Sequence, residues 1–176
     1  MLRYILIYGV IAGVLVGVPL SILTLCMSGQ AMMQYGMVVG YLMMLIALSA
    51  IFLAIKRHRD VDLGGVIRFW PALAMGLGVS VVAGVLYVIV WDASCAIAHV
   101  DFASDYARAT IAEQQAKGVS GAALDRVRGE MDQFKLQYAN PLYRWPETFA
   151  EIFPVGVIVS LISAVLLRNS RFMPAR

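Results

Sequence analysis

The sequence predicts an all-α fold class: a polytopic membrane protein with four transmembrane helices and an external αα-hairpin between the third and the fourth. Its composition excludes an ordinary soluble domain, since 61% of the 176 residues are hydrophobic and only 14% are charged, with a mean hydropathy of +0.78. The apolar residues are also concentrated in four long runs separated by polar segments. We therefore expect the chain to cross a membrane four times.

The first two apolar runs, residues 4–28 and 37–55, are each long enough to cross a hydrocarbon core of about 30 Å as a helix. The first run exceeds the apolar core of a signal peptide, which is about 7 to 15 residues long, so we interpret it as a retained span. The second run leads the chain back toward the side on which it began. The two runs are expected to form an antiparallel hairpin of helices.

Small residues recur at helical spacing in three of the four runs. In lipid, a face of small residues lets two helix backbones approach closely, so we predict that each such face packs against another helix. That helix belongs either to the same chain or to a second copy in a homodimer, and the sequence leaves both open. The predicted helix-packing positions are Gly9, Gly13, Gly17, Gly36, Gly40, Gly156 and Ser160.

The third apolar run, residues 69–91, and the basic segment before it predict the direction of the chain. We interpret this segment, residues 56–65, as a loop, and short basic loops are retained on the cytoplasmic side. The third span would therefore run from the cytoplasm outward. Long basic side chains beside a span extend toward lipid phosphates. The residues predicted to lie at this interface are Lys56, Arg57, Arg59 and Arg68.

Residues 93–148 form a polar segment in which acidic and basic residues are nearly balanced, as expected for an external, aqueous domain. Within it, residues 101–117 and 120–138 are predicted to form two helices. The second carries an apolar stripe at a spacing of three and four residues, and the first carries a matching stripe, so the two are expected to pair. This αα-hairpin would separate the membrane region of residues 1–92 from a last region of residues 149–176.

The last apolar run, residues 149–167, would return the chain to the cytoplasm, so that both termini lie there. The positive-inside rule supports this topology, because basic residues dominate the segments assigned to the cytoplasm. These segments hold Arg3, Lys56, Arg57, Arg59, Arg68, Arg168, Arg171 and Arg176, but only Asp60 and Asp62 as acidic residues. Topology thus explains the net charge of +3 and the pI near 9.0, and we expect no nucleic-acid partner.

Two groups of residues have side chains that could hold a metal ion. His99, Asp101 and Asp105, with Asp92 nearby, offer metal ligands or an acid–base pair at the external face. They lack a histidine pair at metal-binding spacing, and Asp near a helix start is an ordinary cap, so we expect no metal and no cofactor. The second group could bind Cu(I), although methionine is also a common filler of membrane helices: Cys26, Met27, Met32, Met33 and Met37.

Cys26 and Cys95 are both predicted to lie on the outer side of the membrane, where disulfides form. A disulfide between them would need Cα atoms within about 7 Å, and therefore the first and third spans as neighbours at their outer ends. Two unpaired thiols, acting as small apolar residues, are the alternative.

Three stretches resemble the DUF4199 family of bacterial integral membrane proteins. They are G-G-x-I-x-F with the basic residues before it, in residues 56–69, N-P-x-x-R in residues 140–144, and E-I-x-P-x-G-x-x-x-S-L-I in residues 151–162. The resemblance implies a multi-pass protein of the bacterial cytoplasmic (inner) membrane. It implies no activity, cofactor or site, because the family has no established function.

The middle of every apolar run is uncharged, which argues against an ion-coupled transporter, since such carriers usually keep a charged residue there. We expect a non-enzymatic integral membrane protein that contacts membrane lipids and packs with itself or with a membrane-protein partner. Two alternatives stay open. One is the binding or transport of a lipid or a hydrophobic small molecule, and the other is a metal-dependent enzyme at the external face.

Overall fold

The computed structural model describes the backbone of residues 1–26 and 30–174 and the side chains of residues 1–23 and 38–174. In this part of the chain every regular element is a helix and there is no strand. Its helices are α1 (Leu2–Cys26), α2 (Gln30–Leu48), α3 (Ala50–Asp62), α4 (Phe69–Ala98), α5 (Phe102–Ala116), α6 (Ala122–Tyr138) and α7 (Pro141–Leu167).

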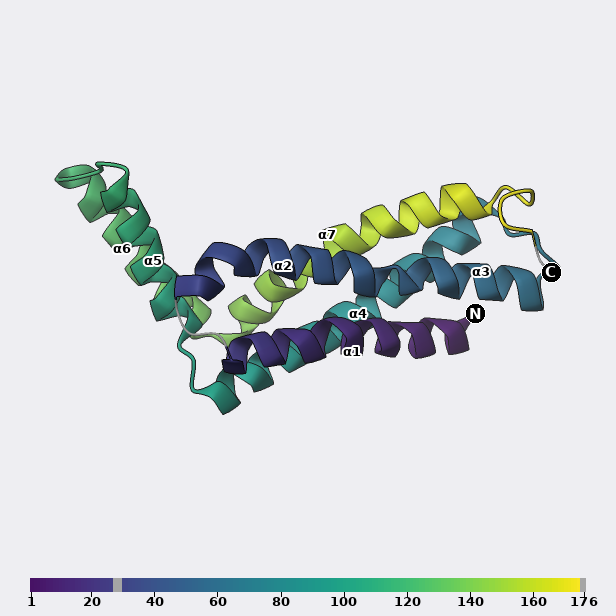
Figure 1. Cartoon of the computed structure of the whole chain (residues 1–176), viewed down its shortest axis with the longest axis horizontal. Helices are drawn as coiled ribbons and strands as arrows, with labels where there is room; N and C mark the ends of the chain where they lie inside the picture. Colours follow the sequence, from purple (N-terminus) through teal and green to yellow (C-terminus); the bar gives the residue numbers. More distant parts are fainter. Residues whose placement is uncertain (27–29, 175–176) are drawn as a thin grey trace.

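Four helical segments of this structure are long and apolar enough to cross a membrane: residues 2–23, 38–62, 69–98 and 141–167. They lie side by side along the long axis of the molecule, and α5 and α6 project from one end of this bundle (Figure 1). The N-terminus and the C-terminal tail lie at the opposite end. The all-α membrane class that the sequence predicts is therefore confirmed.

The second span is built from two helices, and it contains most of the segment that we expected to be a basic loop. The chain continues through Ser49 into α3, so residues 56–62 are helical and the loop reading is wrong for them. Ion pairs one helical turn apart stabilise this extension, with Lys56 Nζ 2.5 Å from Asp60 Oδ2. The reversal comes later, at Gly64 and Gly65, whose φ angles of 63° and 91° are accessible to glycine.

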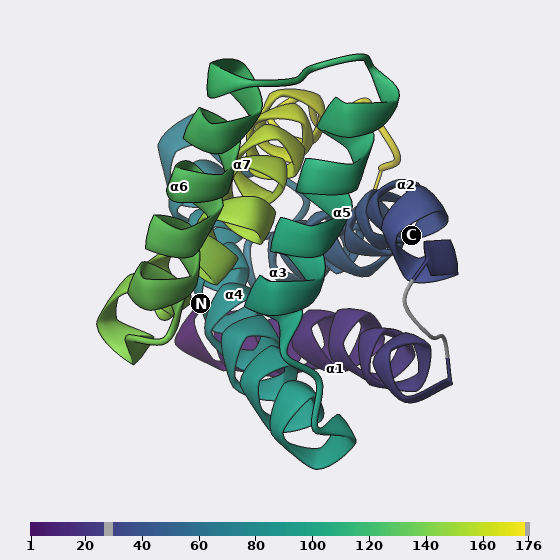
Figure 2. The same cartoon turned by 90° about the vertical axis from the view of Figure 1, so that its left-hand side faces the viewer.

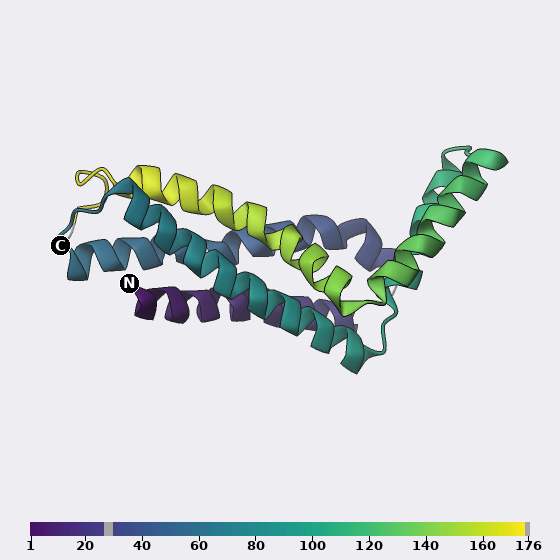
Figure 3. The ribbon, with the colours of Figure 1, turned by 180° about the vertical axis from the view of Figure 1, so that it is seen from behind.

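The glycine face of α1 packs against α4 of the same chain, with the two helices running parallel. A Cβ atom on Gly9 would lie 2.6 Å from Val82, and one on Gly13 would lie 2.7 Å from Leu86. Such a separation is too short for any real Cβ contact, so these glycines permit a backbone approach that alanine would prevent. The helix that covers this face is thus the third span. The second span, which runs antiparallel to α1, also lies beside α1 (Figure 3).

Small residues also join α4 to α7, which run antiparallel. A Cβ on Gly76 would lie 2.7 Å from Ser160 Oγ, and one on Gly156 would lie 2.5 Å from Ser80 Oγ. Each serine hydroxyl donates to a carbonyl one turn earlier in its own helix, which satisfies it in the buried seam. At Gly40, by contrast, an added Cβ would meet no atom of the described residues within 4 Å, so this part of the structure shows no close helix approach there.

Arg59 is the largest fully buried side chain of the bundle, and it does not face lipid phosphates as the sequence suggested. Its guanidinium donates to the carbonyl oxygens of Phe172 at 3.0 Å and Met173 at 2.5 Å, and its Nε donates to Asp60 at 2.6 Å. A weaker bond of 3.4 Å reaches the last residue of α7, Leu167. The Arg59 guanidinium is planar and carries five N–H donors, so it can bond several carbonyl oxygens at once. Arg59 thereby holds the C-terminal tail against α3.

The helices α5 and α6 pack as an αα-hairpin, which we call the hairpin, at an angle to the bundle (Figure 2). Aromatic rings line their contact, with centroids 5.4 Å apart for Tyr106 and Phe134 and 5.5 Å apart for Phe102 and Tyr138. Both membrane helices that flank it exceed the sequence-based limits. The third span continues past Trp91 to the end of α4, and the fourth begins at Pro141 rather than at Phe149.

Candidate functional site

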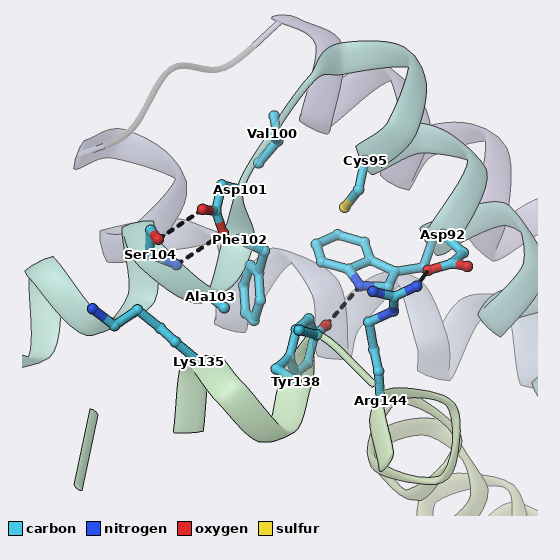
Figure 4. Close-up of a pocket in the computed structure, with 12 residues that line it drawn as sticks. Asp92, Cys95, Val100, Asp101, Phe102, Ala103, Ser104, Lys135, Tyr138 and Arg144 are labelled. Atoms are coloured by element: carbon cyan, nitrogen blue, oxygen red, sulfur yellow. Dashed lines mark hydrogen bonds and ion pairs between the residues drawn. The ribbon is translucent and has the colours of Figure 1, made fainter. Parts of the chain in front are cut away.

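A cavity of about 230 Å³ lies where the hairpin joins the bundle (Figure 4). The end of α4, the first turn of α5, the last turn of α6 and the first turn of α7 form its walls. Because α4 has 30 residues, it is about 45 Å long and exceeds a hydrocarbon core of about 30 Å. The whole of α4 therefore cannot lie within an apolar layer of that thickness, and the cavity lies at its C-terminal end.

Three aromatic side chains from three different helices form one wall of the cavity. The indole Nε1 of Trp91 donates to the hydroxyl of Tyr138 at 3.1 Å, and the Trp91 ring meets that of Phe102 edge to face, with centroids 5.2 Å apart. Burial raises the pKa of the Tyr138 hydroxyl, which keeps it protonated. This wall fastens α4 to both helices of the hairpin.

An arginine from α7 also lines the cavity and lies beside this aromatic wall (Figure 4). Arg144 Nη2 lies 2.7 Å from Asp92 Oδ1, and the neighbouring Trp145 donates from Nε1 to Asp92 Oδ2 at 3.3 Å. The guanidinium also lies 5.8 Å from the centroid of the Tyr138 ring, within the range of a cation–π contact. Its Nε is buried and has no hydrogen-bond partner among the described residues. Arg144 thereby ties α7 to α4 and to α6 at one point.

The acidic residues and the histidine that the sequence offered as metal ligands each have a local structural role. Asp101 caps α5 by accepting hydrogen bonds from Ser104 N at 3.1 Å and Ser104 Oγ at 2.7 Å, and these bonds hold the pKa of its carboxyl below the usual value. Asp105 pairs with Arg108, and His99 ends α4 in a left-handed conformation. Within the described residues, no three side chains of His, Cys, Asp or Glu converge as a metal site.

A family model described as a protein of unknown function, DUF4199, matches residues 7–169. The chain belongs to this family. No curated protein and no solved structure matches it. In this DUF4199 chain the match begins within α1 and ends just after α7, so it includes the four spans and the hairpin.

The DUF4199 description names no reaction, so the sulfur groups have to be judged from the structure. Cys95 carries a free, half-buried thiol that lines the cavity. The side chain of Cys26 lies outside the described residues, and the proposed disulfide lies outside them with it. The same holds for the remaining members of the Cu(I) group, namely Met27, Met32, Met33 and Met37.

One polar contact of the DUF4199 chain was missed by sequence reasoning. Tyr87 of α4 donates from its hydroxyl to Glu151 Oε2 at 3.1 Å. The sequence-based bounds of the last span, residues 149–167, put Glu151 in its first turn, but α7 begins at Pro141, which places Glu151 about 15 Å along the helix. The only sequence signal was a carboxylate within an apolar run.

Arg144 and Trp91, which organise the cavity, were also not selected as site residues. Arg144 is part of the N-P-x-x-R stretch, in which Asn140 caps α7 and Pro141 is its first residue. The stretch thus starts the helix and places an arginine one turn later, facing Asp92. Its spacing was visible in the sequence, but its partner, 52 positions earlier, was not.

Proposed function

We propose that this protein is a non-enzymatic integral membrane protein that presents the hairpin to a protein partner at the membrane surface. The observation that carries the proposal is the way in which the hairpin is fastened. Trp91 of α4 and Arg144 of α7 both contact Tyr138 at the root of the hairpin, and the pair with Asp92 of α4 holds Arg144 in place. Because these contacts join two spans to both hairpin helices, they fix the direction in which the hairpin projects from the bundle.

The hairpin also has exposed surface away from these contacts. Its helices of 15 and 17 residues bury Ala103, Ala107 and Leu124, and most other side chains of α6 are exposed. Their ion pairs, such as Arg128 with Asp125, lie within single helices. Pairs of this kind support an exposed helix without a covering domain. A rigid element that is not covered by the bundle supports a role in contacting another protein.

The glycine faces are less suited to this role. The face of α1 that carries Gly9, Gly13 and Gly17 is covered by α4 of the same chain. A homodimer formed through it would first require that seam to open, so we place the partner contact on the hairpin instead. The partner is either a second copy of this chain or a different membrane protein.

The proposal also includes the orientation of the protein in the membrane. The end of the bundle opposite the hairpin carries Arg3, Lys56, Arg57 and Arg68, and basic residues of this kind are retained in the cytoplasm. Both termini would then be cytoplasmic, and the hairpin would lie on the outer side of a cytoplasmic (inner) membrane.

Site-specific photocrosslinking in cells tests this function. A photoreactive amino acid replaces Arg126 or Gln133, which are exposed on α6, or, as a control, Ile46, which is 69% exposed on the apolar surface of α2. We expect an adduct of one discrete mass from the hairpin positions and none from Ile46. An adduct of twice the chain mass would identify a second copy. Equal, diffuse labelling at all three positions would contradict the proposal.

A further inference from the structure

A second cavity lies at the end of the bundle opposite the hairpin, in a groove between α1 and α3. It has a volume of about 310 Å³ and is lined by Tyr8 of α1 and by five residues of α3. Those five share one helical face, because they follow one another at the spacing i, i+3, i+4, i+7 and i+8. They are Leu53, Lys56, Arg57, Asp60 and Val61.

The groove carries an excess of positive charge. Asp60 is its acidic member, and its carboxylate is shared by Lys56 at 2.5 Å and by the buried Arg59 at 2.6 Å. Arg57 is exposed and makes no hydrogen bond or ion pair to another residue of the described chain. An anion in the groove could therefore bind the free guanidinium of Arg57, and the Lys56 ammonium has donors left after its bond to Asp60.

Below these cations the groove is apolar. Leu53 lies one turn closer to the centre of the bundle than Arg57 and is 54% exposed. On α1, Ile11 and Leu15 share the helical face of Tyr8 and are 42% and 50% exposed. A ligand whose anionic head meets Arg57 would thus have a hydrocarbon path along α1 and α3, toward the middle of the span.

Contacts between α1 and α3 beside the groove fix its width. The Tyr4 hydroxyl donates to Asp62 Oδ1 at 3.2 Å, and the Tyr4 ring lies 5.3 Å from that of His58. These contacts join the start of α1 to the end of α3, one turn from Tyr8. A groove with fixed walls loses less conformational entropy when it is filled.

We propose that this groove binds one anionic phospholipid of the adjacent leaflet, with its phosphate on Arg57 and Lys56 and an acyl chain along Leu53, Ile11 and Leu15. Charge complementarity selects an anionic headgroup, and basic pockets between spans are known sites for such lipids. The apolar path selects a lipid rather than free phosphate. This site is independent of the partner contact of the hairpin, and the proposed orientation only assigns it to the cytoplasmic leaflet.

Native mass spectrometry of the purified full-length protein tests the site. The protein is released from micelles that contain phosphatidylglycerol, which is anionic, or phosphatidylcholine, which is zwitterionic, with identical acyl chains, so that only the headgroup differs. We expect one retained phosphatidylglycerol per chain and weaker retention of phosphatidylcholine. Arg57→Gln should lower phosphatidylglycerol retention by about fivefold, as removal of one surface cation predicts.

Matched variants distinguish lipid binding in the groove from nonspecific attraction between basic residues and lipid. Arg57→Lys keeps the charge and should restore retention, whereas Arg168→Gln removes an exposed cation after α7 and should leave it unchanged. Circular dichroism melting of each variant shows that the fold is retained, which the exposure of Arg57 leads us to expect. Equal retention of the two lipids by the wild type, equal loss in the Arg57 and Arg168 variants, or displacement of the lipid by millimolar inorganic phosphate would each overturn the proposal.

Discussion

The hydroxyl oxygens of Ser21 and Ser94 lie 2.8 Å apart and join α1 to α4 near the hairpin end of the bundle. The contact continues the register of the glycine seam, in which Gly17 meets Val90 and Gly13 meets Leu86. Each step advances one turn along both helices, as parallel packing requires. Each hydroxyl also lies within hydrogen-bond distance of a carbonyl of its own helix, Gly17 O for Ser21 and Val90 O for Ser94. Because a hydroxyl has one proton, one serine donates to the other, which in turn donates to its own carbonyl, so the contact ends in satisfied polar groups.

This register makes Gly13→Leu a direct test of the seam. The added side chain would begin 2.7 Å from Leu86 Cβ, so α1 and α4 would have to separate, and we expect a loss of about 1–3 kcal/mol of stability. Gly40→Leu is the matched control, because an added Cβ there meets open space. Thermal unfolding in mild detergent compares them. If Gly13→Leu lowered the melting temperature no more than Gly40→Leu, the close packing of α1 against α4 at Gly13 would be contradicted.

Much of the bundle was predictable because its signals are local. Apolar runs of sufficient length gave the four spans, and the four-residue repeat of Gly9, Gly13 and Gly17 indicated a packing face. Periodicity identifies a face but not what covers it. The repeat did not identify the helix that covers this face, which the structure shows to be α4, although the second span also contacts α1.

Arg57 and Arg59 show why the site residues were harder to predict. Both belong to one basic cluster, but two residues on a helix are about 200° apart, so their side chains face opposite directions. Arg57 is exposed and Arg59 is fully buried. Similarly, the bond of Arg144 to Asp92 depends on how α4 and α7 cross, and no local pattern encodes that crossing.

The burial of Arg59 leads to a second stability prediction. Arg59→Leu would leave the carbonyls of Phe172 and Met173 without their donor and would remove one partner of Asp60, so we expect a loss of about 3 kcal/mol. Arg57→Leu changes the same residue type on the exposed face and should alter stability by less than about 0.5 kcal/mol in lipid-free detergent. Unfolding by a denaturing detergent, followed by circular dichroism, measures both. Equal losses would mean that the tail is not held by Arg59.

The mount of the hairpin can be tested through Arg144. Arg144→Gln removes the ion pair with Asp92 and the contact with the Tyr138 ring, and because both partners are partly exposed we expect a loss of about 1 kcal/mol. Amide hydrogen exchange should accelerate in α5 and α6 but not in the seam of α1 and α4. Arg126→Gln, which changes an exposed arginine on α6, is the control. Unchanged exchange in the hairpin would show that the aromatic wall alone fixes it.

Asp101 gives the hairpin a predictable response to acid. Its pKa is lower in the folded chain than in the unfolded chain, so the ionised cap contributes fully above about pH 3.9 and this contribution is lost as the pH falls through the folded pKa. The contribution of a cap is about 1 kcal/mol. Asp101→Asn keeps a capping side chain without the charge. Melting curves from pH 7 to pH 3 should therefore decline less steeply for this variant, and parallel curves would contradict the assignment.

The orientation in the membrane decides on which side the hairpin meets its partner, and two reporter fusions determine it. Gly118 has a φ of 83° in the exposed turn between α5 and α6, so an inserted reporter should not disturb either helix. The second reporter follows Arg176. Because the basic residues gather at the end opposite the hairpin, we expect alkaline phosphatase to be active at Gly118 and inactive after Arg176, with a cytoplasmic fluorescent reporter giving the reverse pattern. Equal activity at both positions would require an even number of crossings between them and would remove α7 from the set of spans. A full reversal would keep the bundle but place the hairpin, and any partner that it contacts, in the cytoplasm.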